Sequence, residues 1–467
     1  MIAVVTPEQM RQADAATIVA LGGRTDVLID RAGAAVAHVA IGMMGGGYGK
    51  RVVVICGKGD NGNDGRVAAQ RLRQRGAQVR ELDATATAEV FIDSRTADLV
   101  IDAAYGIGFR GTWQPPIVFD VPVLAVDLPS GLNPMTGKTQ GAVLVAHTTV
   151  TFAALKPCHV LGDGPAICGV IELADIGVDI LDHCADVDIY VVEPSDVASW
   201  LTPREHDAHK WNNGVRVLAG SKGMTGAASL VCAAAMRAGA GIVHASLRDD
   251  AALDAALPTE VVQRRLPDSG WADFIASDLG RFKSLVIGPG LGRGDDVSGE
   301  VRAVLAVADI ATVIDGDGLI AAIDAHNSST VIAKRQAPTI LTPHDGEFAA
   351  LGGDTESADR IGATRDLAVK MDCTVLRKGP TTIITSASGP TFLVVAGDNR
   401  LATAGSGDVL SGVIGALLAR GLEPLAAAAG GALIHALAGQ MSPIEGTLAR
   451  DIAGSISDVL SELVSPR

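Results

Sequence analysis

The residues with the clearest chemical potential form the run LATAGSGD at 401–408, which leads into an apolar stretch at 413–419. Gly405 and Gly407 allow the backbone to turn tightly and to approach a ligand. The composition behind them predicts a helix, and a helix start offers unpaired N–H groups that suit a phosphate. Asp408 lies in the first turn, where a carboxylate can take the proton of a hydroxyl that attacks a phosphoryl group. The alternative is a plain glycine-rich loop in which Asp408 caps the helix.

Further polar residues follow predicted strands in the same half of the chain. Lys378 follows the strand at 374–376, and its ammonium can pair with a nucleotide phosphate as a point charge. His344 follows the strand at 339–341, where we expect it to orient a substrate, although it could also cap the next helix. Asp315 and Asp317, after the strand at 312–315, could bind magnesium or be solvated acids in a turn.

Two glycine-rich turns complete this set. They lie at 220–226 and 288–292, after the strands expected at 215–219 and 284–288. The chain has no G-x-x-x-x-G-K-[ST] loop. The second half therefore has the layout of a small-molecule kinase that lacks a Walker loop, with the phosphate held at 405–407 and Asp408 as the base.

The first half of the chain carries a second group of candidates. The apolar run at 51–56 predicts a buried parallel strand, the polar glycine-rich segment 57–65 a loop, and residues 66–75 a helix. Strand, glycine loop and helix are the usual context of a dinucleotide or phosphate site. We expect Asn61 and Asp64 to contact a ligand there, whereas the alternative is a polar turn.

Two more strand ends in this half carry an aspartate. Asp102 ends the strand at 99–102 and Asp127 ends the strand at 124–127, shortly before Ser130. Ligands gather at the carboxyl ends of strands in open α/β sheets, so these groups should share one crevice with Asn61. Taken singly, each Asp could instead cap a helix. Oxygens of Asn61, Asp102 and Ser130 together could hold a hard monovalent or divalent cation.

Composition and length set the frame for these sites. The 467 residues are 48% hydrophobic but only 3% aromatic and include 55 Gly, which indicates aliphatic α/β cores with many tight turns. Helices are expected from a Thr6 cap and over 25–44, and strands at 148–152 and 189–192. The polar segment 193–207 is the predicted linker, giving domains at 1–205 and 206–467. Lys156 and His159 have no obvious partner, so we expect them to be structural.

Charge and cysteine content exclude several classes of protein. The net charge is −15 and neither half is basic, which argues against nucleic-acid binding. The most apolar region, 413–438, is interrupted by charged residues and proline, so no membrane span is expected there. The six cysteines form no C-x-x-C pair and predict reduced, mostly buried thiols in a cytoplasmic protein: Cys56, Cys158, Cys168, Cys184, Cys232 and Cys373.

The first-half motifs resemble the NAD(P)H-hydrate epimerase domain, which has a Rossmann-like fold. The matching pieces are 57–65, 102–112 and 127–131, with Asp60 and Asn63 standing where the family usually has Asn and Gly. The resemblance implies interconversion of the R and S epimers of hydrated nicotinamide cofactor, with Asp127 catalytic. It also implies potassium held by Asn61, Asp102 and Ser130, and a substrate contacted by Asp60, Asn61, Gly62, Asn63, Asp64, Gly106, Ile107, Gly108, Phe109, Arg110, Gly111, Thr112 and Asp127.

The second half resembles the ADP- or ATP-dependent NAD(P)H-hydrate dehydratase domain, within the ribokinase-like fold. The matching pieces are 226–228, 288–292, 343–347, 378–379 and 405–408. The resemblance implies that Asp408 is catalytic, that magnesium accompanies ADP, and that the substrate is the S-hydrate. The implied substrate contacts are Ala227, Gly292, His344 and Asp408, and the nucleotide contacts are Lys378, Gly379, Pro380, Thr381, Thr382 and Gly407.

Both resemblances together cover nearly the whole chain, in the order of the bifunctional bacterial repair proteins. They imply a cytoplasmic homo-oligomer whose ligands are NAD(P)H hydrates and ADP, with no nucleic-acid or membrane partner. Two other hypotheses remain: a vitamin or sugar kinase fused to a nucleotide-binding domain, and a non-catalytic NAD-sensing or interaction protein. The set Asn61, Asp102 and Asp127 favours the repair enzyme over the kinase, and retention of Lys378 and Asp408 argues against a non-catalytic protein.

Overall fold

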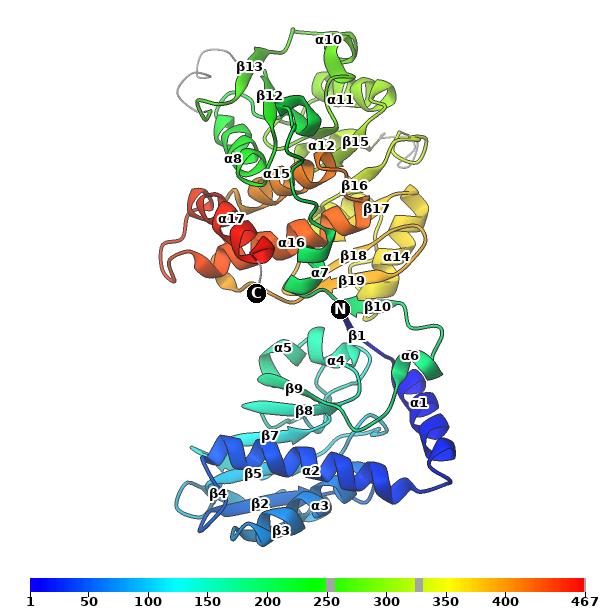
Figure 1. Ribbon diagram of the computed structural model, residues 1–467, viewed down its shortest axis with the longest axis vertical. Coiled ribbons are helices and arrows are strands. Elements are labelled where there is room, and N and C mark those ends of the chain that lie inside the picture. Colours follow the sequence, from blue (N-terminus) through cyan, green and yellow to red (C-terminus); the bar gives the residue numbers. More distant parts are fainter. Residues whose placement is uncertain (249–256, 324–330, 466–467) are drawn as a thin grey trace. The chain divides into compact units, whose positions relative to one another are not determined.

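The computed structural model describes residues 1–248, 257–323 and 331–465, and its contacts divide the chain into two compact units (Figure 1). One unit is Ile2–Ile189 and the other is Tyr190–Arg467 together with Met1. The predicted boundary at 205/206 lies within the second unit. The expected linker contains helix α7 (Pro194–Trp200), which contacts α16 (Pro424–Met441) and α17 (Ala449–Val464) and so belongs to that unit.

The first unit contains a six-stranded parallel sheet in the order β3-β2-β5-β7-β8-β9. Helices α2 and α3 pack on one face of this sheet and form an aliphatic core with it. A short two-stranded sheet, β4-β6, contributes to a second core on the opposite face. This is the Rossmann-like arrangement expected from the sequence. Its elements are β1 (Ile2–Ala3), α1 (Pro7–Ala20), α2 (Thr25–Met44), β2 (Arg51–Cys56), α3 (Asp60–Gln74), β3 (Gln78–Asp83), η1 (Ala84–Ala86), β4 (Phe91–Asp93), β5 (Leu99–Ala103), β6 (Ile117–Phe119), β7 (Val123–Val126), β8 (Thr148–Phe152), α4 (Pro157–Val160), α5 (Gly164–Ile167), β9 (Val170–Ala174) and α6 (Ile180–His183).

The second unit is built on a larger sheet. From β13 through β12, β11, β14, β15 and β16 to β17 the strands are parallel, and β18 and β19 extend the sheet antiparallel. Its elements are β10 (Ile189–Val191), α7, η2 (Lys210–Asn213), β11 (Gly214–Leu218), α8 (Thr225–Arg237), β12 (Ile242–Leu247), β13 (Val262–Arg265), α10 (Trp271–Leu279), β14 (Ser284–Ile287), α11 (Asp295–Val307), β15 (Ala311–Ile314), α12 (Asp317–Ala322), β16 (Thr339–Leu341), α13 (Asp345–Ala350), α14 (Arg360–Met371), β17 (Thr374–Arg377), β18 (Thr382–Thr385), β19 (Thr391–Val394), η3 (Asn399–Leu401), α15 (Ser406–Ala419), α16 and α17.

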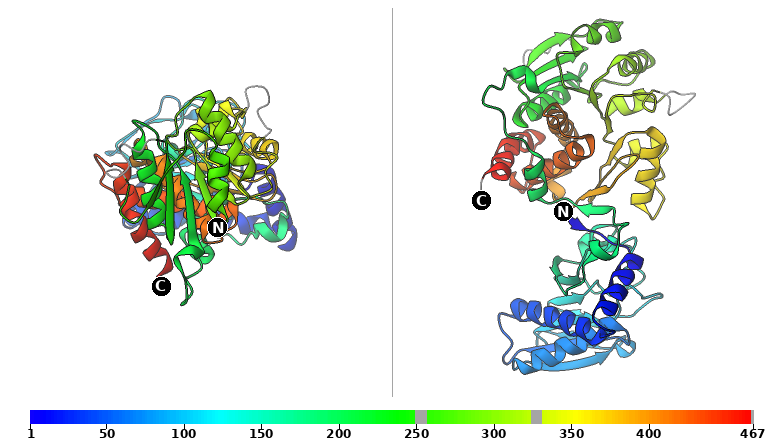
Figure 2. Two further views of the ribbon diagram at one scale, coloured as in Figure 1. Left: turned by 90° about the horizontal axis from the view of Figure 1, so that it is seen from above. Right: turned by 45° about the vertical axis from the view of Figure 1, so that its right-hand side comes forward.

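Helices cover both faces of this sheet, as expected for a doubly wound α/β domain. One core packs α8, α15, α16 and α17 against the sheet, and the other packs α10, α11, α13 and α14 against its opposite face. Helices α15 and α16 lie side by side (Figure 1 and Figure 2). Both are buried nearly all round, which explains the Ala- and Leu-rich composition of the segment behind the 401–408 run.

Two sequence expectations change in detail. Helix α3 begins at Asp60, so two thirds of the expected 57–65 loop is helical. The reason is that extended Gly59 acts as the N-cap and its carbonyl accepts from the N–H of Asn63 at 3.1 Å. Among the described residues, α2 alone is long and apolar enough to cross a membrane by length and composition, and its buried face belongs to the core with α3. All six cysteines are buried and free, as predicted.

Candidate active sites in the two units

The carboxyl ends of β2, β5, β7 and β8 meet at a cavity of about 770 Å³ in the first unit. Gly57 lets the chain turn there, because a Cβ on it would lie 1.9 Å from the carbonyl oxygen of Ala104. The cavity is lined by the predicted residues Asp60, Asn61, Asp64, Gly106, Ile107, Gly108, Phe109, Arg110 and Asp127. Among the described residues its lining does not include Gly62, Asn63, Gly111 or Thr112. Most of the predicted epimerase contacts are therefore brought together.

Asp127 is held by a buried lysine that the sequence analysis treated as structural. The Nζ of Lys156 lies 2.7 Å from Oδ1 of Asp127, 2.8 Å from Oγ1 of Thr151 and 3.2 Å from the carbonyl oxygen of Phe152. The expectation that Lys156 has no partner was therefore wrong. Burial opposes ionisation of Asp127, but Lys156 and the hydroxyl of Thr151 outweigh it and lower the pKa of Asp127. The site thus contains a permanently ionised carboxylate at neutral pH.

His159 holds the backbone of the same residue, which is the structural role expected for it, with a partner that the sequence did not show. Its Nδ1 accepts from the N–H of Lys156 at 3.0 Å, so its Nε2 carries the proton and donates to the carbonyl oxygen of Asp127 at 2.7 Å. Burial lowers the pKa of His159 to about 4, so the ring is neutral. Asp127 has φ +66°, a left-handed conformation that is strained for a non-glycine residue. Backbone and side chain of Asp127 are both tethered, as in other strained functional positions.

Asp102 and Ser130 form a fully buried pair behind the cavity. Ser130 donates from Oγ to one carboxylate oxygen of Asp102 at 2.6 Å and from its backbone N–H to the other at 2.9 Å. Burial raises the pKa of Asp102. In the part of the chain that the structure describes, no basic side chain lies close enough to lower it. The Nδ2 of Asn61 is buried without a hydrogen-bond partner among the same residues. Gly106 lies next to the Asn61 side chain.

Asp64 is the second titratable group with a strongly shifted pKa at the cavity. Burial, followed by the charges of Asp127, Asp60 and Asp14, raises the pKa of Asp64 to about 8. Asp64 is therefore protonated at neutral pH, whereas Asp127 is ionised. Two carboxyl groups whose environments push their pKa values apart are the usual arrangement of an acid and a base.

In the second unit the 401–408 run has the predicted geometry. Gly405 is the N-cap of α15 with φ +88°, and a Cβ on it would lie 2.4 Å from Leu230. Asp408 lies in the first helical turn, and Gly407 faces Lys378, whose Nζ would be 3.2 Å from an added Cβ. The unpaired N–H groups of this helix start therefore lie beside an ammonium group, as an anion site requires.

Asp315 organises the charges at this helix start. Its Oδ1 accepts from the Nζ of Lys378 at 2.7 Å and its Oδ2 from the hydroxyl of Ser411 at 2.7 Å. Asp317 accepts from the N–H of Gly292 at 2.9 Å and pairs with Arg293. Both aspartates thus have protein partners, and the sequence did not predict these contacts. Burial and the charge of Asp315 raise the pKa of Asp408 to about 7, although Lys378 lowers it.

The other predicted dehydratase contacts come from neighbouring loops. Gly290 lies against Ala227, since a Cβ on it would be 2.9 Å from the Cβ of Ala227. A Cβ on Gly292, two residues on, would lie 3.5 Å from Oγ of Ser221, in the turn before α8. Residues 378–381 connect β17 to β18, and Thr382 is the first residue of β18. The loops after β11 and β14 therefore contact one another, and the predicted nucleotide residues follow β17 in the same sheet.

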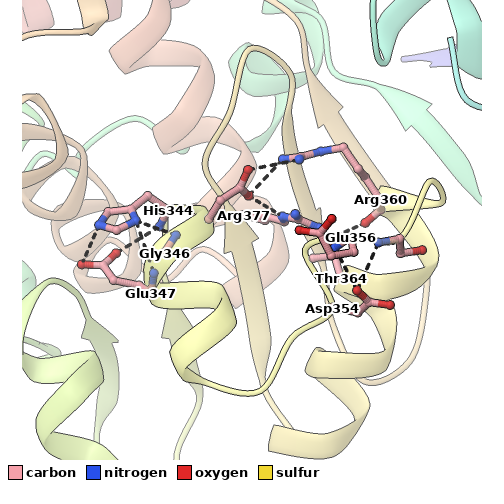
Figure 3. A network of polar contacts seen from close by, with 10 residues as sticks. His344, Gly346, Glu347, Asp354, Glu356, Arg360, Thr364 and Arg377 are labelled. Carbon is pink, nitrogen blue, oxygen red and sulfur yellow. Dashed lines mark hydrogen bonds and ion pairs between the residues drawn. The ribbon is translucent and has the colours of Figure 1, made fainter. Parts of the chain in front are cut away.

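His344 caps a helix, which was the alternative to the substrate role favoured by the sequence. Its Nδ1 accepts from the N–H groups of Gly346 at 3.0 Å and Glu347 at 3.3 Å at the start of α13 (Figure 3). Its Nε2 lies 3.4 Å from Oε1 of Glu347, and the side chain is 61% exposed; a substrate contact by His344 stays a prediction. Nearby, Asp345 accepts from both Arg360 and buried Arg377, which fixes the strand end before Lys378. The two arginines are labelled in Figure 3.

Comparisons with known proteins decide which family these sites belong to. The family model described as NAD(P)H-hydrate dehydratase matches residues 215–460, and the one described as YjeF-related protein N-terminus matches 25–89 and 80–158. The bifunctional NAD(P)H-hydrate repair enzyme Nnr of Mycobacterium leprae is 39% identical over 469 residues, covering 93% of this chain and 92% of that protein. This chain belongs to the family of bifunctional NAD(P)H-hydrate repair enzymes.

Solved structures agree with the fold of the second unit of this repair enzyme. An ADP/ATP-dependent NAD(P)H-hydrate dehydratase from Bacillus subtilis, co-crystallised with ATP and Mg²⁺, is 27% identical with a TM-score of 0.51, covering 58% of this chain and 98% of that one. A ribokinase-like protein from Enterococcus faecalis is 23% identical with a TM-score of 0.53, covering 60% of this chain and 97% of that one. The ribokinase-like fold is thereby confirmed.

Replacing Lys156 of this repair enzyme with methionine should destabilise the first unit. The change leaves the carboxylate of Asp127 buried without its counter-charge, which typically costs about 3–5 kcal/mol. We expect a lower thermal midpoint of that unit by circular dichroism and loss of its catalytic activity. Lys138→Met, at an exposed position of the same unit, is the matched control and should change neither. Unchanged stability of Lys156→Met would show that the pair is not formed in solution.

Proposed function

We propose that this chain repairs hydrated reduced nicotinamide cofactors with two separate sites. The first unit interconverts the R and S hydrates, and the second dehydrates the S-hydrate with ADP to give NAD(P)H, AMP and phosphate. The observation that carries the proposal is the pair of prepared carboxylates: Asp127, held ionised by Lys156, and Asp408, at the start of α15 with a pKa of about 7. Asp127 shares its cavity with Asp64, and Asp408 lies near Lys378 at the start of α15.

Dehydration begins at the hydroxyl of the S-hydrate. Asp408 takes its proton while the oxygen attacks the terminal phosphoryl group of ADP, so an O–P bond forms and the bond to AMP breaks. The N–H groups at Gly407 and Asp408, with Lys378, bind the phosphoryl oxygens on which charge gathers. The ring nitrogen then expels phosphate, and loss of a proton from the neighbouring ring carbon restores the reduced nicotinamide.

Epimerisation needs a base and an acid on the hydrated ring. Asp127 takes the hydroxyl proton as the bond between that carbon and the ring nitrogen breaks, which gives an open-chain aldehyde. Asp64, protonated at neutral pH, supplies a proton to the nitrogen. The carbonyl group turns, the nitrogen attacks its other face, and both protons return. The opposite shifts of the two pKa values suit these roles.

Potassium fits the buried pair behind the epimerase cavity. Asp102 is fully buried with a raised pKa, so a monovalent cation would supply the counter-charge that the described residues do not. Asn61 and Ser130 contribute further oxygen atoms, which suit a hard cation. The cation would fix the strand end next to the substrate loop. Replacement of potassium by a larger organic cation should then weaken epimerisation.

Magnesium is expected to accompany the nucleotide. Asp315 and Asp317 are engaged by Lys378, Ser411, Arg293 and Gly292, and no cluster of three or more His, Cys, Asp or Glu side chains in the described ranges is placed to hold a metal. A magnesium ion would therefore be bound mainly by the phosphates of the nucleotide and would neutralise their charge. ADP as the preferred nucleotide, a homo-oligomer and a cytoplasmic location stay predictions.

The decisive experiment follows the absorbance of reduced nicotinamide. Purified protein is mixed with R and S hydrates and Mg²⁺, with ADP in one cuvette and ATP in another. Complete recovery, faster than unassisted epimerisation, is the expected result and identifies the nucleotide. Recovery that stops at the S fraction would remove the epimerase, and no recovery with either nucleotide would favour a kinase of a different small molecule.

A further inference from the structure

Asp14, a carboxylate at the epimerase cavity, has no part in the chemistry above. It lies on α1 and lines the cavity together with Met10 and Ile18, four residues before and after it. This spacing puts the three side chains on one face of the helix. A capping box between Thr6 and Gln9 fixes the start of α1 and hence the face turned to the cavity.

Asp14 is half-buried and forms no hydrogen bond or ion pair with any residue that the structure describes. Arg11, a basic residue on the same helix, pairs with Glu8 rather than with Asp14. Lys156 uses its donors on Asp127, Thr151 and Phe152. Burial raises the pKa of Asp14 to about 6, so the group is mostly ionised at neutral pH. A desolvated carboxylate without a protein donor is costly unless a ligand supplies one.

The charges around this part of the cavity limit what the ligand can present. The cavity is lined by four carboxyl groups, Asp14, Asp60, Asp64 and Asp127, and by three basic side chains, Arg11, Arg110 and Lys156. Arg11 pairs with Glu8 and Lys156 with Asp127, so a ligand group that carries N–H or O–H donors is favoured next to Asp14. A hydrated nicotinamide ring has two such groups, its hydroxyl and its carboxamide. The hydroxyl is assigned to Asp127, so the carboxamide remains.

The placement of the two aspartates agrees with this division. Asp127 follows β7 and is tied to the end of β8, whereas Asp14 comes from α1, a different wall of the same cavity. On the ring, the carbon that bears the carboxamide lies opposite the carbon that bears the hydroxyl. Apolar side chains of the same cavity, including Leu28, Phe152 and Ile176, suit the flat faces of the ring.

Resting on the function proposed above, we propose that Asp14 is a further substrate-binding residue of the epimerase site, whose carboxylate accepts a hydrogen bond from the carboxamide N–H of the hydrated nicotinamide. The ring is then held at both ends, which keeps the reacting carbon beside Asp127 while the ring opens and closes. Asp14 precedes residues 25–158, so the matched family segment does not include it.

The test compares two substrates in a chain whose dehydratase is blocked by Asp408→Asn. One is the S-hydrate of NADH, and the other is the corresponding hydrate of the reduced 3-acetylpyridine analogue, in which a methyl group replaces the carboxamide nitrogen. Formation of the R-hydrate is followed by chromatography. With Asp14 present, kcat/KM should be about 10- to 100-fold higher for the carboxamide substrate. Asp14→Ala should remove that preference while leaving the rate with the acetyl substrate within about twofold.

Controls separate this role from a structural one. Gln12→Ala changes an exposed polar residue on the same helix and should leave both rates unchanged. Asp14→Asn keeps an uncharged acceptor and should give an intermediate preference. Equal losses with both substrates, or no loss with either, would overturn the assignment. If the chain with Asp14 intact epimerises neither substrate, the proposed epimerase function fails, and the assignment fails with it.

Discussion

Asp408→Asn should abolish recovery of NAD(P)H from the S-hydrate while leaving epimerisation intact. The substitution keeps the size of the side chain but removes the base, a loss that typically lowers the rate by about 10²–10⁴-fold. Release of phosphate from ADP should fall in parallel, since the hydroxyl can no longer attack. Epimerisation should persist because the acid and base proposed for it, Asp64 and Asp127, lie in the other unit. Phosphate release and absorbance at the reduced-nicotinamide band measure the first effect, and chromatography of the two epimers measures the second.

The pH dependence of dehydration gives an independent check on Asp408. Its pKa of about 7 is raised chiefly by burial and by Asp315, and only the ionised form can accept a proton. The value of kcat/KM should therefore rise with pH up to about 7 and level off above it. Asp458→Asn, an exposed acid in the same unit, is the matched control and should keep the wild-type rate and profile. Loss of both activities in Asp408→Asn would contradict two independent sites.

Asp127→Ala should stop epimerisation and leave dehydration of the S-hydrate running. A mixture of hydrates would then be recovered only to the extent of its S fraction, and the R-hydrate would accumulate. The reason is that the side chain removed is the only carboxylate at the cavity, among the described residues, that an ammonium group at 2.7 Å holds ionised. The measurement is the residual R-hydrate after the S-hydrate is exhausted, with excess ADP present.

Folding must be checked for this variant, because Lys156 would be left buried without its partner. Asp127→Asn retains a hydrogen-bond acceptor for Lys156, and its thermal midpoint should lie closer to that of the wild type. Asp182→Asn, an exposed acid in the same unit, serves as the control. If R-hydrate is cleared faster than unassisted epimerisation allows in a folded Asp127→Asn protein, Asp127 is not the essential base.

Much of the fold follows from local patterns in the sequence. Continuous apolar runs such as 51–56 and 123–126 form buried parallel strands because both faces of each sheet are covered. The run at 401–408 gives a helix start with a left-handed Gly405, since only glycine fits next to Leu230 there. The extended Gly59 that starts α3 at Asp60 was missed, because a polar glycine-rich segment has the same composition in a loop and in a first helical turn.

Pairs of residues from different strands could not be found in this way. Lys156 and Asp127 are 29 residues apart, and they meet because β7 and β8 are parallel neighbours whose carboxyl ends lie side by side. Lys378 and Asp315 are 63 residues apart and meet for the same reason across β15 to β17. A strand pattern predicts which residues end a strand, but strand order decides which ends face one another.

The sequence by itself therefore determined the two α/β folds, the catalytic carboxylates to be tested and the glycine-rich turns around them. These depend on composition, periodicity and backbone freedom, which are local properties of the chain. Only the tertiary structure decided the charge state of those carboxylates and their partners. Burial, the contacts of Lys156 and Asp315, and the charge of Asp14 near Asp64 set them, because desolvation and Coulomb interactions depend on distances through space rather than along the sequence.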